Sequence, residues 1–594
     1  MAVYKAPLRD MRFVLHEFLG AESIQALPGC DDVTPDLVDA VLEEAGKISE
    51  EVLFPLNRSG DEEGCSFKDG AVTTPAGFKE AYATFVEGGW PSLACDPEHG
   101  GQGLPQTVAA MVAEMVSAAN LSFGMYPGLT HGAYVAVERF GDDHLKETYL
   151  PKLAEGSWTG TMCLTEPQCG TDLGLVRTRA EPRDDGSHTV TGTKIFITAG
   201  DHDLAENIVH LVLARTPGAP AGTKGISLFL VPKFRPAADG SPEEANGVTC
   251  GSIEHKMGIA ASSTCVINFD DATGHLVGEE NKGMRAMFTM MNAARLFVGI
   301  QGLGLAETAY QNAVAYARER LQGRSLAGAK HPDKAADPII VHPDVRRMLL
   351  IMRASIEGAR GLAAWVAHSL DVSERHPDQA LRQEADDLVA LLTPVIKAYF
   401  TDTAFEATNL GMQVMGGHGY IRENGMEQYV RDARITQIYE GANGIQALDL
   451  VGRKLPAHTG RYLRRFFHPL AQFIETHGAD PRLGDFVPPL AKAFGRLQRA
   501  TAFVAEKGLG DAEEAAAAAT DTLRLFALVA LAFVWARMVV VALDRLDGDD
   551  GGFYHAKLAT GRFFMQRILP QTGALLATVM AGKKPLMAFP EDAF

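Results

Sequence analysis

The spacing of apolar and polar residues changes along the chain. Between residues 36 and 120, apolar side chains recur at the three- and four-residue intervals of amphipathic helices, as in Asp36–Ala45. The loop Pro97–Pro105 interrupts this stretch with glycine and proline, which break helices. From about residue 158 the pattern changes to short β-branched runs between turn residues, such as His188–Thr198 and Cys265–Phe269. We therefore expect helices followed by an all-β module.

The chain becomes helical again from about residue 283. Val298–Arg320 and Gln379–Met415 are long, rich in alanine and periodic. Further on, Leu525–Ala536 is entirely apolar, but it is too short to cross a bilayer, and the Arg537 that follows is costly inside a membrane. The pattern predicts a buried helix of a helical bundle here, with peripheral membrane contact as the alternative, and no transmembrane segment.

This order of elements predicts a mainly α protein with a central β domain. One hydrophobic core rarely grows beyond about 250–300 residues, so a chain of 594 residues needs several domains. We expect an N-terminal extension (1–35), an N-terminal helical domain (36–157), a middle β domain (158–282), a C-terminal helical bundle (283–455) and an additional C-terminal helical domain (456–594). Pro456–Gly460 is the predicted start of the last domain.

Charge and cysteine content narrow the possible functions. The formal net charge is −19, and so acidic a surface repels phosphate backbones, which argues against nucleic-acid binding. The seven cysteines form no CxxC pair, so neither a disulfide framework nor a metal site is expected. The N-terminal sequence has no basic segment followed by an apolar one, as a secretory signal has. These features predict a cytoplasmic protein.

Several common catalytic motifs are absent. No GxGxxG follows a predicted strand, because Gly302–Gly304 and Gly417–Gly419 lie in helical or loop context and lack the third glycine. P-loop, HExxH and GxSxG motifs do not occur either. The sequence therefore gives no support to a Rossmann enzyme, an ATPase, a zincin or an α/β-hydrolase.

Four other segments contain residues suited to chemistry: Met162–Asp172, Lys194–Gly200, Gln413–Tyr420 and Arg431–Gln446. Each has an ordinary structural explanation by itself: a surface turn, a buried strand, a helix end and a solvated corner. The loop Met162–Asp172 also offers hydroxyls and backbone N–H groups that can hold a polar ring edge or a phosphate. The fourth segment places Glu440 at a Tyr-Glu-Gly corner before the next helix.

Together, in order and spacing, the four segments resemble the acyl-CoA dehydrogenase family of flavoproteins. The resemblance covers residues 36–455, and Pro97–Gly101 and the pair Glu319–Arg320 match it too. It implies a helical N-terminal domain, a β-barrel-like middle domain and a four-helix-bundle C-terminal domain. Both chain ends resemble a long bacterial subgroup that has an added C-terminal helical domain.

The resemblance implies α,β-desaturation of an acyl-CoA thioester. Glu440 matches the carboxylate that removes the α-proton, while its backbone N–H would bond the thioester oxygen. Gly441 would keep the backbone slim beside the thioester. On the same grounds Thr171, Asn292 and Arg295 would border the CoA channel, although a structural ion pair is an alternative role for Arg295.

The resemblance also implies bound FAD. The residues matching its binding positions are Met162, Leu164, Thr165, Thr171, Phe196, Thr198, Arg320, Gln413, Gly416, Gly417 and Asn443. Phe196 stands where the family often has Trp, and Ala442 and Gly444 replace a hydroxyl and an amide common in the family, which Asn443 is expected to offset. Gln413, Gly416 and Gly417 would receive the adenosine half from a neighbouring subunit, which implies a homodimer or homotetramer.

The resemblance further implies electron-transfer flavoprotein as the electron acceptor. Some members of the long subgroup act on 3-(methylthio)propanoyl-CoA, which is the first substrate to expect. The alternatives are a short-, medium- or long-chain fatty acyl-CoA. Two functional classes compete with this interpretation: a flavin oxidase or monooxygenase on the same scaffold, and a non-catalytic helical assembly protein. The intact Glu440 and Thr165 loop argue against the non-catalytic protein.

Overall fold

The computed structural model describes residues 3–237, 239–549 and 551–594, without the side chains of residues 292 and 293. The chain divides into two compact units, which are described here separately. The helical unit comprises Met1–Glu43, Pro105–Glu114 and Val298–Phe594, and the mixed unit comprises Glu44–Leu104 and Met115–Phe297. Helices α3 (Pro35–Ile48), α6 (Gln106–Ala119) and α9 (Gly283–Glu319) contribute residues to both.

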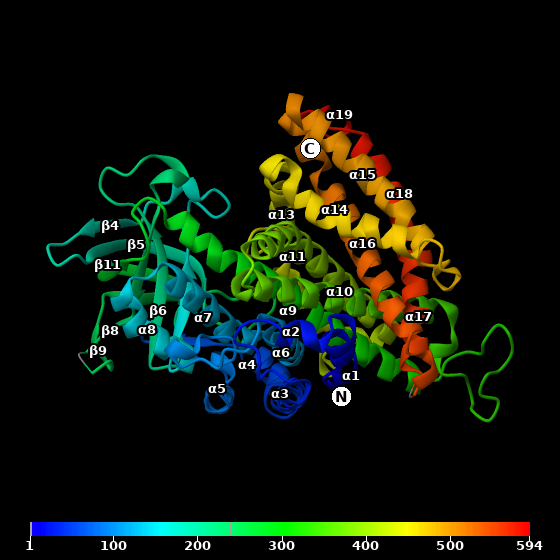
Figure 1. Ribbon diagram of the computed structural model, residues 1–594. Helices are drawn as coiled ribbons and strands as arrows, with labels where there is room; N and C mark the ends of the chain where they lie inside the picture. The colour runs from blue at the N-terminus through cyan, green and yellow to red at the C-terminus, as the bar shows by residue number, and fades with distance from the viewer. Residues whose placement is uncertain (1–2, 238, 550) are drawn as a thin grey trace. The chain divides into compact units, whose positions relative to one another are not determined.

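One sheet dominates the mixed unit (Figure 1). Its strands are β3 (Trp158–Cys163), β4 (Arg179–Pro182), β5 (His188–Thr198), β6 (Asn207–Ala214), β7 (Ser227–Pro232), β10 (Val248–Ile253) and β11 (Thr264–Leu276). Their order is β3-β6-β7-β11-β5-β4, with β10 also paired to β11. Two short antiparallel pairs accompany it, β1 (Ser66–Lys68) with β2 (Ala71–Thr73) and β8 (Phe234–Pro236) with β9 (Pro242–Ala245).

The sheet follows the predicted apolar runs. Every residue of β3, β6 and β7 is buried, as expected for strands covered on both faces. β11 is longer than the predicted Cys265–Phe269, because it continues past two aspartates that resemble a turn in sequence. Asp271 there takes a left-handed φ of 54°, and beyond it the strand also pairs with β7, with His275 opposite Leu230.

The remaining helices of the mixed unit are α4 (Pro55–Glu63), α5 (Phe78–Glu87), α7 (Leu121–Phe140) and α8 (Asp143–Glu155). α7 packs on β3 and α8 packs on α7. A close approach explains Gly160 on β3, since an added Cβ would lie 2.4 Å from the Cβ of Ala133 on α7. The helices therefore cover the β3 side of the sheet and fix the strand that leads into the Thr165 loop.

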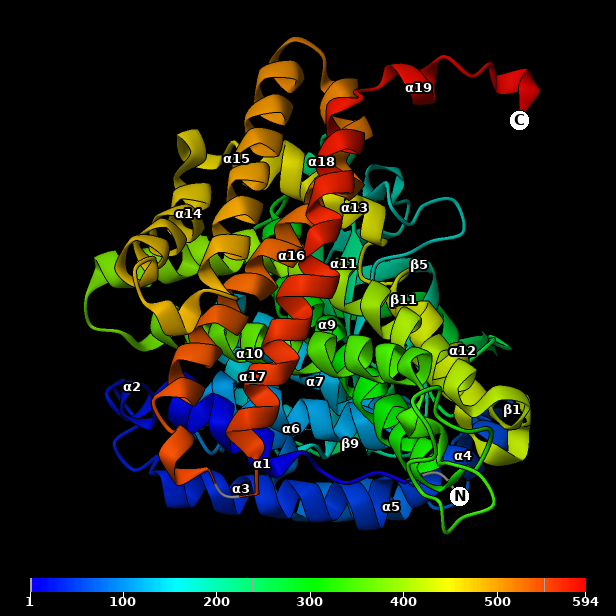
Figure 2. The same cartoon turned by 90° about the vertical axis from the view of Figure 1, so that its right-hand side faces the viewer.

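The helical unit is built from long helices joined by shorter ones (Figure 2). They are α1 (Leu8–Arg12), α2 (Ala21–Gln25), α10 (Pro343–Arg375), α11 (Gln379–Met415), α12 (Met426–Thr436), α13 (Asn443–Asp449), α14 (Ala457–His477), α15 (Val487–Gly510), α16 (Ala512–Leu543), α17 (Phe553–Phe563), α18 (Thr572–Met580) and α19 (Lys584–Met587). α10 packs along α11, and α16 packs against α10, α15 and α18.

The apolar run predicted to be buried lies in α16. Leu525–Ala536 is buried throughout, which confirms the prediction of a core helix. The Arg537 guanidinium lies over the rings of Phe18, Trp365 and Phe533, with its central carbon 4.6, 5.1 and 5.6 Å from their centroids. Cation–π contacts of this kind stabilise a cation where water is scarce, so the arginine is compatible with an apolar bundle.

Close helix packing joins the last helical block to the bundle. The Trp535 Nε1 on α16 donates to the Ala354 carbonyl on α10 at 3.0 Å. Gly358 and Gly361 on α10 face α16, and an added Cβ would lie 2.6 Å from Trp535 and 2.8 Å from Val534. The absence of side chains at these glycines lets the two helix backbones approach closely.

A buried charge network also spans the helical unit. The Arg360 guanidinium on α10 pairs with Asp10, Glu114 and Glu307, which come from α1, α6 and α9. The fully buried Lys557 of α17 pairs with the same Asp10 and with Glu357, 2.7 Å away. Because buried charges need partners, this network ties the N-terminal extension and α17 to the bundle.

The predicted fold class is therefore confirmed. Helices precede and follow a central β region, and an additional helical block ends the chain. Within the described part of the chain, two helical stretches, Gln379–Tyr420 and Ala512–Leu543, are long and apolar enough to cross a membrane by length and composition. Their most apolar windows are 78% and 83% buried within the protein, which is typical of core helices.

Candidate functional site

In the mixed unit, the structure brings the Thr165 loop and the end of β5 together. The Ile195 N–H donates to the Thr165 carbonyl at 2.9 Å, so the loop runs along the strand. Met162 is buried on β3, whereas Leu164, Thr165 and Thr198 are half-buried. Leu164, Thr165 and Thr198, three of the predicted cofactor positions, thus lie in one partly open region.

Phe196 stands out on this part of β5. Its side chain is 59% exposed, although Ile197 beside it and Lys194 are buried. Its φ of 58° lies in the left-handed region, which is a genuine outlier for a bulky residue. Backbone strain of this kind persists where the surrounding structure enforces it, often at binding sites.

A buried ion pair underlies this loop and strand. The Lys194 Nζ lies 2.8 Å from the Glu166 Oε1 and donates to the Leu164 carbonyl at 3.0 Å, and both charged side chains are almost inaccessible. Glu166 also accepts from Thr178 Oγ1 at 2.6 Å and from the Arg177 N–H at 2.8 Å. Burial alone would raise the pKa of Glu166, but Lys194 and these donors lower it to about 2.

The predicted CoA-side residues of the mixed unit are more scattered. Thr171 is exposed in the loop after the Thr-Glu-Pro turn, next to Asp172, whose side chain accepts from the Gly174 N–H at 2.9 Å. Arg295 on α9 is buried, and its guanidinium carbon lies 6.0 Å from the Phe288 ring centroid. The side chain of Asn292 lies outside the described residues.

In the helical unit, Glu440 lies at a tight corner between α12 and α13. Its side chain is half-buried, and its φ is 56°, while that of Gly441 is 88°. The buried Gln446 donates through Nε2 to the Glu440 and Gly441 carbonyls at 3.1 and 3.0 Å. Tyr439 is bonded through its hydroxyl to Gln301 on α9 at 2.6 Å. The strained conformation at Glu440 is therefore enforced from both sides.

Asn443, the first residue of α13, is turned toward α11. Its Oδ1 accepts from the Lys397 Nζ at 2.8 Å, and its Nδ2 donates to Thr401 Oγ1 at 2.9 Å and to Asp402 Oδ1 at 2.7 Å. The contact of Asn443 with FAD stays a prediction, and the structure assigns its amide a set of bonds within the protein.

A second predicted group gathers where α9 and α11 end. Arg320 follows the last residue of α9 and is exposed, as is Gln413 in the last turn of α11. Tyr316 and His418 connect the two segments through a hydrogen bond of 3.2 Å between the hydroxyl and Nδ1. This places the predicted diphosphate arginine near the glycine loop.

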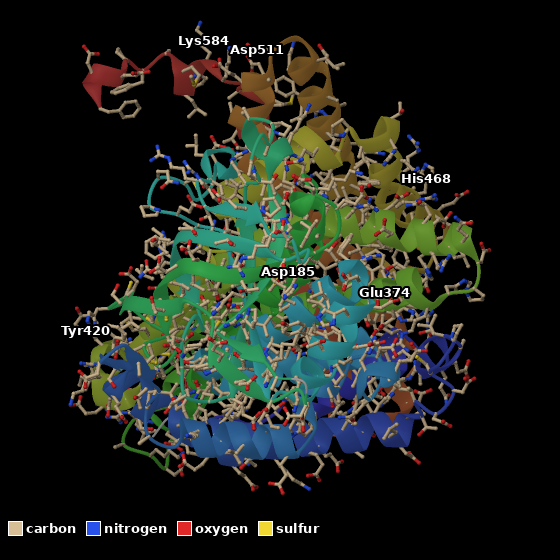
Figure 3. All side chains as sticks on the ribbon, turned by 90° about the vertical axis from the view of Figure 1, so that its left-hand side faces the viewer. Asp185, Glu374, Tyr420, His468, Asp511 and Lys584 are labelled. Atoms are coloured by element: carbon tan, nitrogen blue, oxygen red, sulfur yellow. The ribbon has the colours of Figure 1, made fainter. Side chains whose placement is uncertain are left out.

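The glycine loop itself is open. Gly416 takes a φ of 58°, and nothing lies within 4 Å of a Cβ built on Gly416 or Gly417. Tyr420, which ends the loop, is 81% exposed and is labelled on the ribbon of the helical unit in Figure 3. The exposed Arg320 guanidinium, the exposed Gln413 amide and the uncovered backbone of the glycine loop are suited to bind a phosphate or a nucleoside of a separate molecule.

These surroundings fit FAD, each set within its own unit. An exposed aromatic face at Phe196, beside half-buried Leu164, Thr165 and Thr198, suits a flat heteroaromatic ring. The exposed Arg320 suits a diphosphate. Among the described residues, no group of three or more His, Cys, Asp or Glu side chains is arranged to hold a metal.

Sequence reasoning missed the residues that support these sites. Glu166, Lys194, Lys397 and Gln446 contribute buried polar contacts that hold the Thr165 loop and the Glu440 corner. A usable signal was present for Lys397, which stands inside the apolar run Thr393–Phe400 of a long helix. Charged residues are almost never fully buried unless paired, so such a lysine predicts a specific acceptor.

The chain matches four consecutive domain families of known proteins. These are the acyl-CoA dehydrogenase N-terminal domain over residues 39–157, the middle domain over 161–272 and the C-terminal domain over 281–455, followed by the acetyl-CoA dehydrogenase C-terminal-like domain over 466–590. Together these matches extend over nearly the whole sequence after the N-terminal extension.

Individual proteins match over nearly their full length. The chain is 44% identical to the 3-methylmercaptopropionyl-CoA dehydrogenase of Ruegeria pomeroyi, over 96% of this chain and 97% of that protein. It is 34% identical to a butyryl-CoA dehydrogenase of Syntrophomonas wolfei, over 100% and 99%. The crystal structure of an acyl-CoA dehydrogenase complexed with FAD from Bacillus anthracis shares the fold, with a TM-score of 0.73, 21% identity, and coverage of 94% and 90%.

Proposed function

Because the chain belongs to the acyl-CoA dehydrogenase family and is an FAD-dependent acyl-CoA dehydrogenase, we propose that its substrate is 3-(methylthio)propanoyl-CoA. One observation carries the choice of substrate: identity to the Ruegeria relative is 44% over almost the entire chain, whereas identity to the butyryl-CoA relative is 34%. Butyryl-CoA is accordingly the second candidate, and the product in either case is the trans-2-enoyl-CoA.

Glu440 is the proposed general base. Its carboxylate takes the proton from the α-carbon of the thioester, and its backbone N–H donates to the thioester oxygen, where negative charge develops. Gln446 donates to the Glu440 and Gly441 carbonyls, which holds the backbone immediately after Glu440 in one conformation. FAD, when bound, supplies the acceptor for the hydride that leaves the β-carbon.

The remaining site residues are proposed binding residues. For the flavin ring they are Met162, Leu164, Thr165, Phe196 and Thr198. For the diphosphate and adenosine they are Arg320, Gln413, Gly416 and Gly417, the last three acting on the FAD of a neighbouring subunit. Thr171, Asn292 and Arg295 are proposed to border the CoA channel. Support comes from the exposure of Phe196 and Arg320 and from the open glycine loop.

We also propose a homo-oligomer, with electron-transfer flavoprotein as the electron acceptor and the cytoplasm as the location. Packing of α16 against α10 covers a helix face of the bundle with the chain's own added block. This favours a dimer over a tetramer. Sedimentation of the FAD-loaded enzyme tests the assembly.

Reoxidation of the reduced enzyme tests the electron acceptor. Rapid stoichiometric peroxide formation in air would indicate an oxidase instead of transfer to electron-transfer flavoprotein.

The substitution Glu440→Gln tests the proposed base. Glutamine is almost isosteric but cannot accept a proton, so flavin reduction by substrate should fall about 10²–10⁴-fold. FAD content and acyl-CoA binding should persist. Glu475→Gln, an exposed position on α14 of the same unit, serves as the control and should behave as wild type. A Glu440→Gln enzyme that reduces flavin within about threefold of the wild-type rate would exclude Glu440 as the base.

Anaerobic flavin bleaching with a series of acyl-CoAs tests the substrate. We expect the highest kcat/KM with 3-(methylthio)propanoyl-CoA. A preference of about tenfold for butyryl-CoA or a long-chain acyl-CoA, which corresponds to roughly 1.4 kcal/mol in transition-state binding, would replace that substrate while leaving the dehydrogenase activity in place.

A further inference from the structure

The Glu440 corner is fastened to one stretch of α11. Lys397, Thr401 and Asp402 lie within two turns of that helix, and each bonds the side chain of Asn443. The backbone of this stretch also takes part, since Asn443 Nδ2 donates to the Ala398 carbonyl at 3.1 Å. The start of α13 is thereby held at one place on α11.

The same helix also holds the other side of the corner. Gln437, just after α12, donates through Nε2 to Asp402 Oδ1 at 2.6 Å, the atom that also accepts from Asn443. The Asn443 N–H in turn donates to the Gln437 carbonyl at 3.1 Å. Residues 437 and 443 are therefore tied to each other and to α11, and Glu440 lies midway between these two ties.

Among the residues that bond Asn443, Lys397 carries the largest free-energy cost of burial. It is fully buried on an apolar helix, and a buried ammonium is expensive unless it finds an acceptor. An apolar residue would pack at this point of the bundle without that cost. A satisfied buried polar network rigidifies the groups that it joins, and here the joined group is the corner that carries the strained φ of Glu440.

We propose that Lys397 and Asn443 are positioning residues for the reaction. They act through the corner: Lys397 orients the Asn443 amide, Asn443 fixes the first turn of α13, and the corner then holds the Glu440 carboxylate and N–H in one arrangement. This inference rests on the proposed base role of Glu440. A misplacement of about 1 Å at a reacting group can cost about a hundredfold in rate, so loss of the tie should lower kcat.

The test uses near-isosteric variants of the FAD-loaded enzyme: Lys397→Met, Asn443→Leu and the double variant. Replacing both members of a buried polar pair by apolar residues of similar volume is often close to neutral for stability, so the double variant separates folding from positioning. The flavin-reduction rate at saturating acyl-CoA should fall 10- to 100-fold in all three variants. FAD content and the dissociation constant for acyl-CoA should stay within threefold of wild type.

Non-additivity is the decisive readout. If Lys397 acts through Asn443, the double variant should lose about as much rate as either single variant, since residues in one network couple. Lys557→Met is the matched control, because Lys557 is also fully buried and paired in the helical unit. It should lower the unfolding midpoint and leave kcat unchanged.

Two results would overturn the proposal. One is a wild-type kcat in the double variant. The other is rate losses that multiply between the two sites and scale with each variant's loss of unfolding midpoint. The Glu440→Gln variant distinguishes failure of this proposal from failure of the proposed base. If Glu440→Gln is active, Glu440 is not the base. If Glu440→Gln is inactive and the double variant is fully active, only the positioning role is refuted.

Discussion

The buried pair of Glu166 and Lys194 gives the sharpest quantitative prediction. Glu166→Gln keeps the shape of the side chain but removes the charge opposite Lys194, whose side chain is 0% exposed. Breaking a buried pair from one side typically costs about 3–5 kcal/mol, because the remaining charge is left without compensation. The variant also replaces one acceptor oxygen by an amide N–H₂ donor, so either the Thr178 hydroxyl or the Arg177 N–H loses its acceptor.

Hydrogen exchange is the appropriate assay. A chain with two compact units need not unfold in one transition, so a single unfolding free energy is poorly defined. Exchange of the peptide covering β5 reports the local opening that breaks the pair. A loss of about 3–5 kcal/mol corresponds to at least about a hundredfold faster exchange, since each 1.4 kcal/mol is tenfold.

The control is an exposed ion pair of the same unit. Arg58 and Glu62 lie 2.8 Å apart and are each about half exposed, with side-chain values of 49% and 50%. Exposed pairs contribute under about 1 kcal/mol, so Glu62→Gln should change exchange less than about fivefold. If Glu166→Gln behaves like Glu62→Gln, the pair does not hold the loop on the strand and our reasoning about its burial is wrong.

The same pair predicts a pH dependence with a definite sign. The pKa of Glu166 is lowered to about 2 from an ordinary value of 4.5. A lowered carboxyl pKa means that the stabilisation is complete above about pH 4.5 and is lost as the pH falls toward 2. Protection of β5 in the wild type should therefore decline over that window, and Glu166→Gln should show a flatter acid limb. An equal decline in both proteins would contradict the assignment.

Two further substitutions test other parts of the structure. Phe196→Ala should lower the FAD content of the purified protein while leaving the unfolding midpoint within about 1 °C, because the ring is 59% exposed and surface changes cost little; full FAD retention would show that the ring is not a cofactor contact. Gly361→Leu should make the block after residue 456 sensitive to limited proteolysis, because a Cβ there would lie 2.8 Å from Val534, and unchanged resistance would show that α16 accommodates it.

Periodicity was sufficient for elements whose burial is uniform. The apolar run Leu525–Ala536 could be assigned to a core helix because nothing polar interrupts it, and it is buried throughout. The strand Cys265–Phe269 was predicted too short, since Asp270 and Asp271 resemble a turn. They instead mark the point after which β11 continues to a second partner, β7, a pairing that depends on residues far away in sequence.

The supporting polar contacts were beyond sequence reasoning for a physical reason. Lys397 and Asn443 are 46 positions apart, and Glu166 and Lys194 are 28 apart. No local propensity specifies such partners, because the acceptor for a buried charge is chosen by tertiary packing. What the sequence does contain is half of each pair: a charged residue in a place where an apolar one would cost less.

The corner after Glu440 departs from the family pattern at Ala442 and Gly444. Ala442 and Gly444 have no polar side chain, and a Cβ built on Gly444 meets nothing within 4 Å. Asn443, the expected replacement, points its amide at α11. The predicted contact of Asn443 with FAD would therefore have to share this amide with α11. We therefore expect substitution of Asn443 to lower the flavin-reduction rate more than the FAD content. Substitution of Arg320 should lower the FAD content more than the flavin-reduction rate.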